Sequence, residues 1–143
     1  WHADWENAQA IPVVASPACS AEQRQAVELF LIGMDMIPIW SKDHPGLYVI
    51  RSIAMLVNEA CEAVLHAIAS EQDIDSAMKY GVNYPCGPFE WADRIGYYTI
   101  LQILENMYRI YGEDRYRTSI YLAKKAVQGH AQKTQQQPLR VAG

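Results

Sequence analysis

The stretch GVNYPCGPFEWADRIG, residues 81–96, carries the most specific pattern in this sequence. Its glycines and prolines predict an irregular connector that reverses the chain. Pro88 suits the first turn of a helix, because the N–H that proline lacks would be unpaired there anyway. Phe89 and Trp91 fall on this short helix, which should end near Gly96. The pattern therefore indicates two helices joined by a tight connector, with aromatic side chains available for a core or an interface.

The longest predicted helix precedes this connector and covers residues 47–69. Pro45 would lie in its first turn, and Asp43 or His44 would cap it, Asp43 being the better capping residue. At 1.5 Å per residue such a helix is roughly 35 Å long. Its apolar residues cover more than one face, so it should lie at the centre of a bundle or against a partner subunit.

Shorter helical patterns complete a mostly α-helical domain that we assign to residues 43–129. Ser70 is a suitable N-cap for the first of them, and Gly129 should end the last. We expect residues 130–143, which hold few apolar side chains, to form a flexible tail. The helices are predicted over residues 71–80, 88–95, 97–111 and 120–128.

The N-terminal segment predicts a strand, a helix and a strand. Apolar runs at residues 11–15 and 36–40 flank a helix that Ser20 should cap, with Gln23 at the capping-box position. Two short strands do not make a stable parallel sheet, and the chain starts without Met. We therefore interpret residues 1–42 as the C-terminal remnant of a Rossmann-type α/β unit, and expect the chain to be a piece of a longer protein.

Composition excludes several classes of partner. The net charge is −4 with both signs interspersed, so no basic surface for nucleic acid is predicted. Polar side chains interrupt the apolar residues 53–68, which fall short of the ~18 charge-free residues that a membrane span needs. We therefore expect neither nucleic acid nor a membrane as partner. The three cysteines contain no CxxC pair and predict reduced thiols in a cytoplasmic protein.

No cofactor or metal motif is apparent. The sequence has neither the G-x-G-x-x-G of dinucleotide-binding proteins nor a phosphate-binding P-loop, so we expect no NAD bound by this chain alone. The four histidines are scattered, and no metal site is predicted. Glu62 and His66, four residues apart, should share an ordinary helix surface.

The sequence resembles the C-terminal domain of 3-hydroxyacyl-CoA dehydrogenases over residues 45–128. The family pattern A-S-x-x-D-I-D-x-A-M-x-x-G matches residues 69–81, and its P-x-G-P…D-x-x-G segment matches residues 85–96. The likeness is strongest to the second C-terminal copy of tandem-domain members, of the 3-hydroxyadipyl-CoA and 3-hydroxybutyryl-CoA dehydrogenase type. It implies a helical domain like that at the C-terminus of 6-phosphogluconate dehydrogenase. Residues 11–42 resemble, more weakly, the end of the family's Rossmann domain.

One departure from the family bears on activity. In active members the long helix opens Pro-Gly-Phe-x-x-Asn-Arg, and this Asn reaches the active site, whereas Ile50 stands at that position here. The family's catalytic His and Glu lie in its Rossmann part. The resemblance thus implies a full-length, NAD-dependent enzyme of fatty acid metabolism that oxidises a 3-hydroxyacyl-CoA to the 3-ketoacyl-CoA. It also implies that this chain alone contains no catalytic residue.

Two roles for the domain remain open, with a free-standing helical binding protein as a third. The domain can supply a wall of the acyl-CoA cleft, for which the candidates are Arg51, Asn58 and Glu59, polar groups within an apolar helix that need partners. Alternatively, it is purely a structural module that forms a homo-dimer or a pseudo-dimer with another C-terminal domain. The interface candidates are Met55, Leu56, Phe89 and Trp91.

Overall fold

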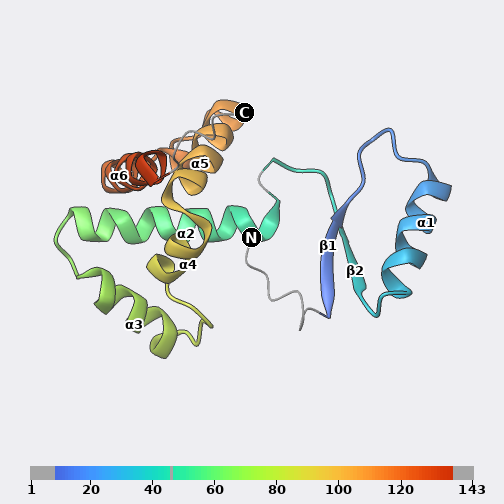
Figure 1. The fold of residues 1–143 in the computed structure, drawn as a ribbon, viewed down its shortest axis with the longest axis horizontal. Coiled ribbons are helices and arrows are strands. Elements are labelled where there is room, and N and C mark those ends of the chain that lie inside the picture. The colour runs from blue at the N-terminus through green and yellow to red at the C-terminus, as the bar shows by residue number, and fades with distance from the viewer. Residues whose placement is uncertain (1–8, 46, 137–143) are drawn as a thin grey trace, which may run out of the picture. The chain divides into compact units, whose positions relative to one another are not determined.

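The computed structural model describes residues 9–45 and 47–136, and the chain divides into two compact units at residue 44. The first unit contains β1 (Ala10–Val14), α1 (Ala21–Ile32) and β2 (Ile37–Ser41). The two strands pair in parallel, and α1 connects them (Figure 1). The predicted order of strand, helix and strand is confirmed.

A capping box starts α1 where the sequence predicts it. The Gln23 N–H donates to the Ser20 hydroxyl at 3.2 Å, and the Ser20 N–H donates to the Gln23 side-chain oxygen at 2.9 Å. Each polar group thereby satisfies a backbone donor that the first helical turn leaves unpaired. Leu31 is the buried residue of this helix, whereas Phe30 is 65% exposed. The unit therefore leaves much of its apolar surface uncovered.

The second unit is a helical bundle built around α2 (Tyr48–Leu65). The elements that follow are α3 (Glu71–Gly81), α4 (Pro88–Ile95), α5 (Tyr97–Tyr111), the short 3-10 helix η1 (Asp114–Tyr116) and α6 (Ile120–Gln136). Helices α4, α5 and α6 all pack against α2 (Figure 1). The core residues come from every one of these helices except α3: Ala54, Val57, Ala60, Cys61, Phe89, Ala92, Ile100, Leu104, Met107, Tyr116 and Leu122. The mostly helical fold is as predicted, and the bundle itself covers α2.

Helix α2 is shorter at both ends than the predicted helix of residues 47–69. Its N-cap residue is Leu47, with φ 46° and no side-chain cap, so Asp43 and His44 do not cap it. At its other end Ala67 takes φ 52°, and its N–H donates to the Val64 carbonyl while the Ile68 N–H donates to the Ala63 carbonyl. This Schellman arrangement usually has glycine in the left-handed position. Because the sequence places alanine there, it carries no signal for the end of this helix.

Helix α6 is longer than predicted, because it passes through Gly129 and ends at Gln136. One glycine inside a helix costs only about 1 kcal/mol relative to alanine, and the following alanine, glutamines and lysine favour the helix. Residues 130–136 are thus helical, contrary to the predicted flexible tail. Residues 137–143 lie outside the described part of the chain. No helix within the described ranges is long and apolar enough to cross a membrane.

Candidate functional site

Arg51, a predicted cleft residue, is engaged within the chain. Its guanidinium donates a hydrogen bond to the Tyr116 hydroxyl. The guanidinium carbon also lies 5.1 Å from the centre of the Tyr116 ring and 5.2 Å from that of Tyr111. Cation–π contacts of this kind stabilise a charge against aromatic faces. The charge of Arg51 therefore holds the end of α5 and η1 against α2.

The side-chain amide of Asn58 is also hydrogen-bonded within the chain, through both its nitrogen and its oxygen. Its side chain is nearly inaccessible, at 2% exposed. The amide nitrogen donates to the Arg117 carbonyl at 3.0 Å, and the amide oxygen accepts from the Ser119 N–H at 2.8 Å. Ser119 in turn accepts a hydrogen bond from the Tyr121 N–H at 3.2 Å and so caps α6. One buried amide therefore positions the start of α6 relative to α2.

The three predicted cleft residues do not converge on one site. Arg51 and Asn58 both contact the segment between α5 and α6, whereas Glu59 is exposed. Ile50, at the family's Asn position, is 7% exposed and offers no polar atom. The described part of α2 thus presents no group that could donate a hydrogen bond to a substrate from that position.

The interface candidates differ in how much surface they offer. Phe89 is 3% exposed and belongs to the core, so its assignment to an interface is wrong. Met55 packs against the core from a partly buried position. Trp91 is also partly buried, with its ring 5.7 Å from that of Tyr84. Leu56 is partly buried too. The connector aromatics therefore contribute mainly to the bundle.

The connector is held by Asp75, a residue of the matched family pattern to which the sequence analysis assigned no role. Its carboxylate accepts hydrogen bonds from the N–H groups of Phe89, at 2.8 Å, and Glu90, at 3.1 Å. Asp75 is only 8% exposed. Its carboxylate, which comes from α3, lies at the N-terminus of α4, where the helix dipole favours a negative group. A Cβ on Gly87 would lie 2.2 Å from the Asp75 Cγ. Glycine is required at 87 for this close approach.

An ion pair also joins the two helices on either side of this connector. Lys79 of α3 pairs with Glu90 of α4. The hydrogen bond from Lys79, followed by those from the Gly87 N–H and the Cys86 thiol, lowers the pKa of Glu90 to about 2. Burial raises the pKa of the Cys86 thiol. Cys86 is therefore a structural thiol, not an activated nucleophile.

A second polar cluster ties α3 to α6. The Glu71 carboxylate accepts a hydrogen bond from the Tyr121 hydroxyl at 2.6 Å and pairs with the Lys125 ammonium at 2.6 Å. The hydrogen bond to Glu71 raises the pKa of Tyr121 to about 12. Burial raises the pKa of the neighbouring Cys61 thiol to about 12. These groups remain neutral or paired near pH 7, which suits packing and not proton transfer.

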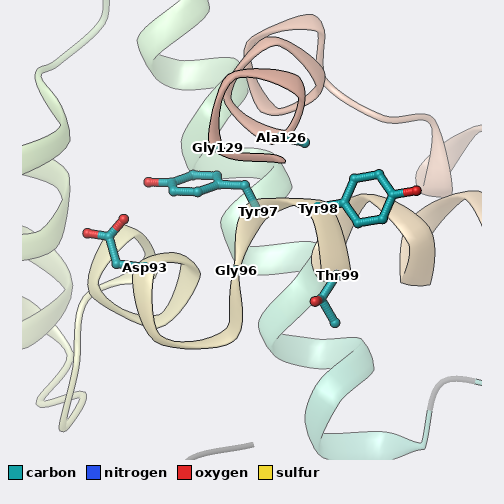
Figure 2. A pocket seen from close by; sticks show the side chains of 7 residues that line it. All are labelled: Asp93, Gly96, Tyr97, Tyr98, Thr99, Ala126 and Gly129. Atoms are coloured by element: carbon teal, nitrogen blue, oxygen red, sulfur yellow. The ribbon is translucent and has the colours of Figure 1, made fainter. Parts of the chain in front are cut away.

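A hollow of about 230 Å³ lies where α4, α5 and α6 meet (Figure 2). The Tyr97 ring points to the side of the hollow where Asp93 lies, and the Tyr98 ring points to the opposite side (Figure 2). Burial raises the pKa of Tyr97 above its ordinary range. The described residues include no group of His, Cys, Asp or Glu side chains placed to hold a metal ion. The lining is Asp93, Gly96, Tyr97, Tyr98, Thr99, Ala126 and Gly129.

The first unit does not fit NAD at its strand-to-helix turn. A dinucleotide-binding unit brings a glycine-rich turn close to the pyrophosphate, which then lies at a free helix N-terminus. Here residues 15–20 read Ala-Ser-Pro-Ala-Cys-Ser, without glycine. The Ser20 hydroxyl also already accepts the Gln23 N–H of the first turn of α1. No step of a hydride transfer can therefore be assigned to these residues.

Comparisons with known proteins agree with the resemblance. Residues 46–140 match the family described as 3-hydroxyacyl-CoA dehydrogenase, C-terminal domain. The chain is 48% identical over 85 residues to the 3-hydroxyadipyl-CoA dehydrogenase of Escherichia coli K12, covering 59% of this chain and 18% of that protein. It is 33% identical over 121 residues to the probable 3-hydroxybutyryl-CoA dehydrogenase of Deinococcus radiodurans, covering 85% of this chain and 44% of that one.

A solved structure gives the same result for the fold. The 3-hydroxybutyryl-CoA dehydrogenase of Escherichia coli K12 is similar with a TM-score of 0.80 and 35% identity, covering 87% of this chain and 26% of that one. The chain thus spans less than half the length of these relatives. What it shares with them is the helical domain and part of the segment before it.

Proposed function

The chain belongs to the family of 3-hydroxyacyl-CoA dehydrogenase C-terminal domains, and we propose that it is a non-catalytic helical domain of an enzyme oxidising a 3-hydroxyacyl-CoA to the 3-ketoacyl-CoA. The enzyme would use NAD bound outside this chain, and its substrate would be an acyl-CoA. We place this enzyme in the cytoplasm, which the three free cysteines support. The domain's own role would be to pack against another C-terminal domain, in a homo-dimer or a pseudo-dimer.

The observation that carries this proposal is the internal use of the polar groups on α2. Arg51 is held by Tyr116, and both ends of the Asn58 amide are bonded to the segment before α6. A residue that binds substrate must release such partners or share them, at a cost of about 1–3 kcal/mol for each buried group left unpaired. With Ile50 at the family's Asn position, the contacts favour a structural role over a cleft wall.

The surface of α6 supports a contact with another domain. Ile120 and Val127 are 60% and 65% exposed, and they lie seven residues apart on one side of the helix. A shallow depression of about 470 Å³ follows this side and is also lined by Ala123. Helix α2, in contrast, is covered by α4, α5 and α6. We therefore place the contact on α6 and not along α2.

Light scattering of the chain over a dilution series tests this role. We expect a mass near twice 16.2 kDa at high concentration. Val127→Glu should shift the chain to a monomer, because it places a charge in an apolar contact. Gln102→Glu adds the same charge at an exposed position of α5 and should leave the mass unchanged. A wild-type chain that stays monomeric at every concentration would reject homo-dimerisation. Calorimetric titration with NAD should give no heat of binding, and a measurable affinity would contradict a non-catalytic domain.

A further inference from the structure

The hollow between α4, α5 and α6 is not used by the proposed function. Its volume is about 230 Å³, whereas pockets for drug-sized ligands take about 300–1,000 Å³. A cavity of about 150 Å³ already holds benzene. The hollow is therefore too small for a CoA or a nucleotide and large enough for one long side chain.

Gly129, which lines the hollow, is a glycine that the described fold does not require. It lies within α6 without a positive φ, where alanine would be the more stable residue. A Cβ on Gly129 would meet no described atom within 4 Å, whereas a Cβ on Gly87 would lie 2.2 Å from the Asp75 Cγ. Gly96 and Ala126 line the same hollow. Small residues thus leave open a space that no described side chain fills.

The hollow carries a net negative charge. Asp93 in its lining is exposed and, among the described residues, forms no ion pair. The Lys125 ammonium lies 5.3 Å from the centre of the Tyr97 ring, but it pairs with Glu71 at 2.6 Å, so this pair adds no net charge. Arg94 is exposed and does not line the hollow. Because α4 ends where α5 begins, the partial charges of about −0.5 and +0.5 at these helix ends cancel, and the Asp93 carboxylate decides the sign.

A carboxylate beside an aromatic ring suits a guanidinium group. The Tyr97 ring points to the side of the hollow where Asp93 lies (Figure 2). Arginine binds a carboxylate through two parallel N–H groups and stacks on aromatic faces, whereas lysine is a strongly hydrated point charge. We propose that this hollow receives an arginine side chain from a part of the longer enzyme outside this chain. Asp93 accepts hydrogen bonds from the guanidinium, and the small residues Gly96, Ala126 and Gly129 leave room for its aliphatic stem.

The arginine comes from a different neighbour than the second C-terminal domain. The proposed contact between two such domains lies along Ile120 and Val127, on another side of α6 than Ala126 and Gly129. The hollow therefore remains accessible when that contact is made. This arginine rests on the proposed function because it requires the longer enzyme, but it does not require the α6 contact.

NMR titration of the 143-residue chain with N-acetyl-arginine amide tests the site directly. We expect saturating shifts of the Gly96, Thr99 and Gly129 amides, with a Kd on the order of 1–10 mM for a probe of this size. Neutral N-acetyl-citrulline amide should not saturate in that range. Asp93→Asn should weaken binding of the arginine probe at least about tenfold, while Asp114→Asn, which removes the same charge at an exposed position of η1, should not. Equal binding of the two probes, or of one probe to the two variants, would overturn the proposal.

Filling the hollow separates binding from stability. Gly129→Leu places a side chain where no described atom lies, and leucine favours the helix, so the variant should melt no lower than the wild type and yet lose the arginine probe. Gln72→Leu, at an exposed position of α3, is the matched control and should keep the probe. A folded Gly129→Leu chain that binds the probe as the wild type does would contradict the proposed site.

Hydrogen exchange of the longer enzyme tests whether an arginine fills the hollow there. The first turn of α5 has no side-chain cap, so the amides of residues 97–99 should exchange rapidly in this chain. We expect exchange at least about tenfold slower in the longer enzyme, and Asp93→Asn should remove most of this protection. Equal exchange with and without the Asp93 carboxylate would reject the arginine. A lower mass of the Asp93→Asn chain in light scattering would show that a second copy occupies the hollow instead, contrary to the proposal.

Discussion

Replacing Asp75 by alanine should destabilise the helical unit more than any other single carboxylate substitution on α3. The change removes both acceptors for the N–H groups of Phe89 and Glu90. These two N–H groups lie in the first turn of α4, where no backbone acceptor is available to them. Because Asp75 is only 8% exposed, little water can reach the site to replace the carboxylate. The helix would lose its cap and its attachment to α3 in one step.

The expected loss is about 3 kcal/mol. A hydrogen bond to a charged group contributes about 1.5–3 kcal/mol, and loss of a capping side chain alone costs about 0.5–2 kcal/mol. Two bonds to one carboxylate are not additive, so the expected loss stays well below the sum of the separate values. Gly87→Ala should lose a similar amount, because its Cβ would lie 2.2 Å from the Asp75 Cγ and displace the same carboxylate.

Urea unfolding followed by circular dichroism measures this loss. All variants should be compared at one protein concentration, because association changes the apparent stability. Asp73→Ala is the control, since this exposed carboxylate in the first turn of α3 should contribute only about 0.5 kcal/mol. A loss below about 1 kcal/mol for Asp75→Ala, or equal losses for the two aspartates, would refute the conclusion that Asp75 holds the connector.

Three further outcomes are expected. Asn58→Ala should lower the free energy of unfolding by about 2–3 kcal/mol, because it leaves the buried Ser119 N–H and the partly buried Arg117 carbonyl without their partner, while Glu59→Ala changes it by less than about 0.5 kcal/mol. In the longer enzyme neither change should alter kcat/KM, and a selective rise in KM for Asn58→Ala would restore the cleft role. Glu90 has a folded pKa of about 2, below its ordinary 4.5, so its stabilising effect is present above pH 4.5 and is lost as the pH falls toward 2. Glu90→Gln should therefore lose less stability than the wild type over that interval, as melting temperatures at several pH values will show, and parallel curves would contradict this. Burial raises the pKa of Cys61 to about 12, so a thiol reagent at about pH 8 should modify the partly exposed Cys19 well before Cys61, and equal rates of labelling would refute it.

Local signals predict most elements of the fold. The capping box of Ser20 and Gln23, the N-cap of Ser70 and Pro88 at the start of α4 act through neighbouring backbone groups, so the sequence alone determines them. The end of α2 at Ala67 is not predictable in this way, because alanine in a left-handed conformation gives no sequence signal. The extension of α6 past Gly129 differs from the prediction, because one glycine does not outweigh several good helix formers.

For the candidate site, less could be predicted from the sequence than for the helices and strands. The sequence identified Arg51 and Asn58 as polar residues in an apolar helix that needed partners, and it identified Ile50 as a departure from the family. It could not show that those partners are Tyr116, Arg117 and Ser119, about 60 residues further along the chain. Hydrogen bonds over such separations depend on how the helices pack, and the apolar periodicity that predicts each helix does not show which residues of other helices will lie beside it.

The sequence by itself determined that this protein is a helical domain of a known family, preceded by a short α/β segment, because helix caps, turns and apolar periodicity are local properties. Only the tertiary structure decided that Asp75 holds the connector and that Phe89 fills the core. Each of these depends on the distance and direction between residues that only the folded chain brings together.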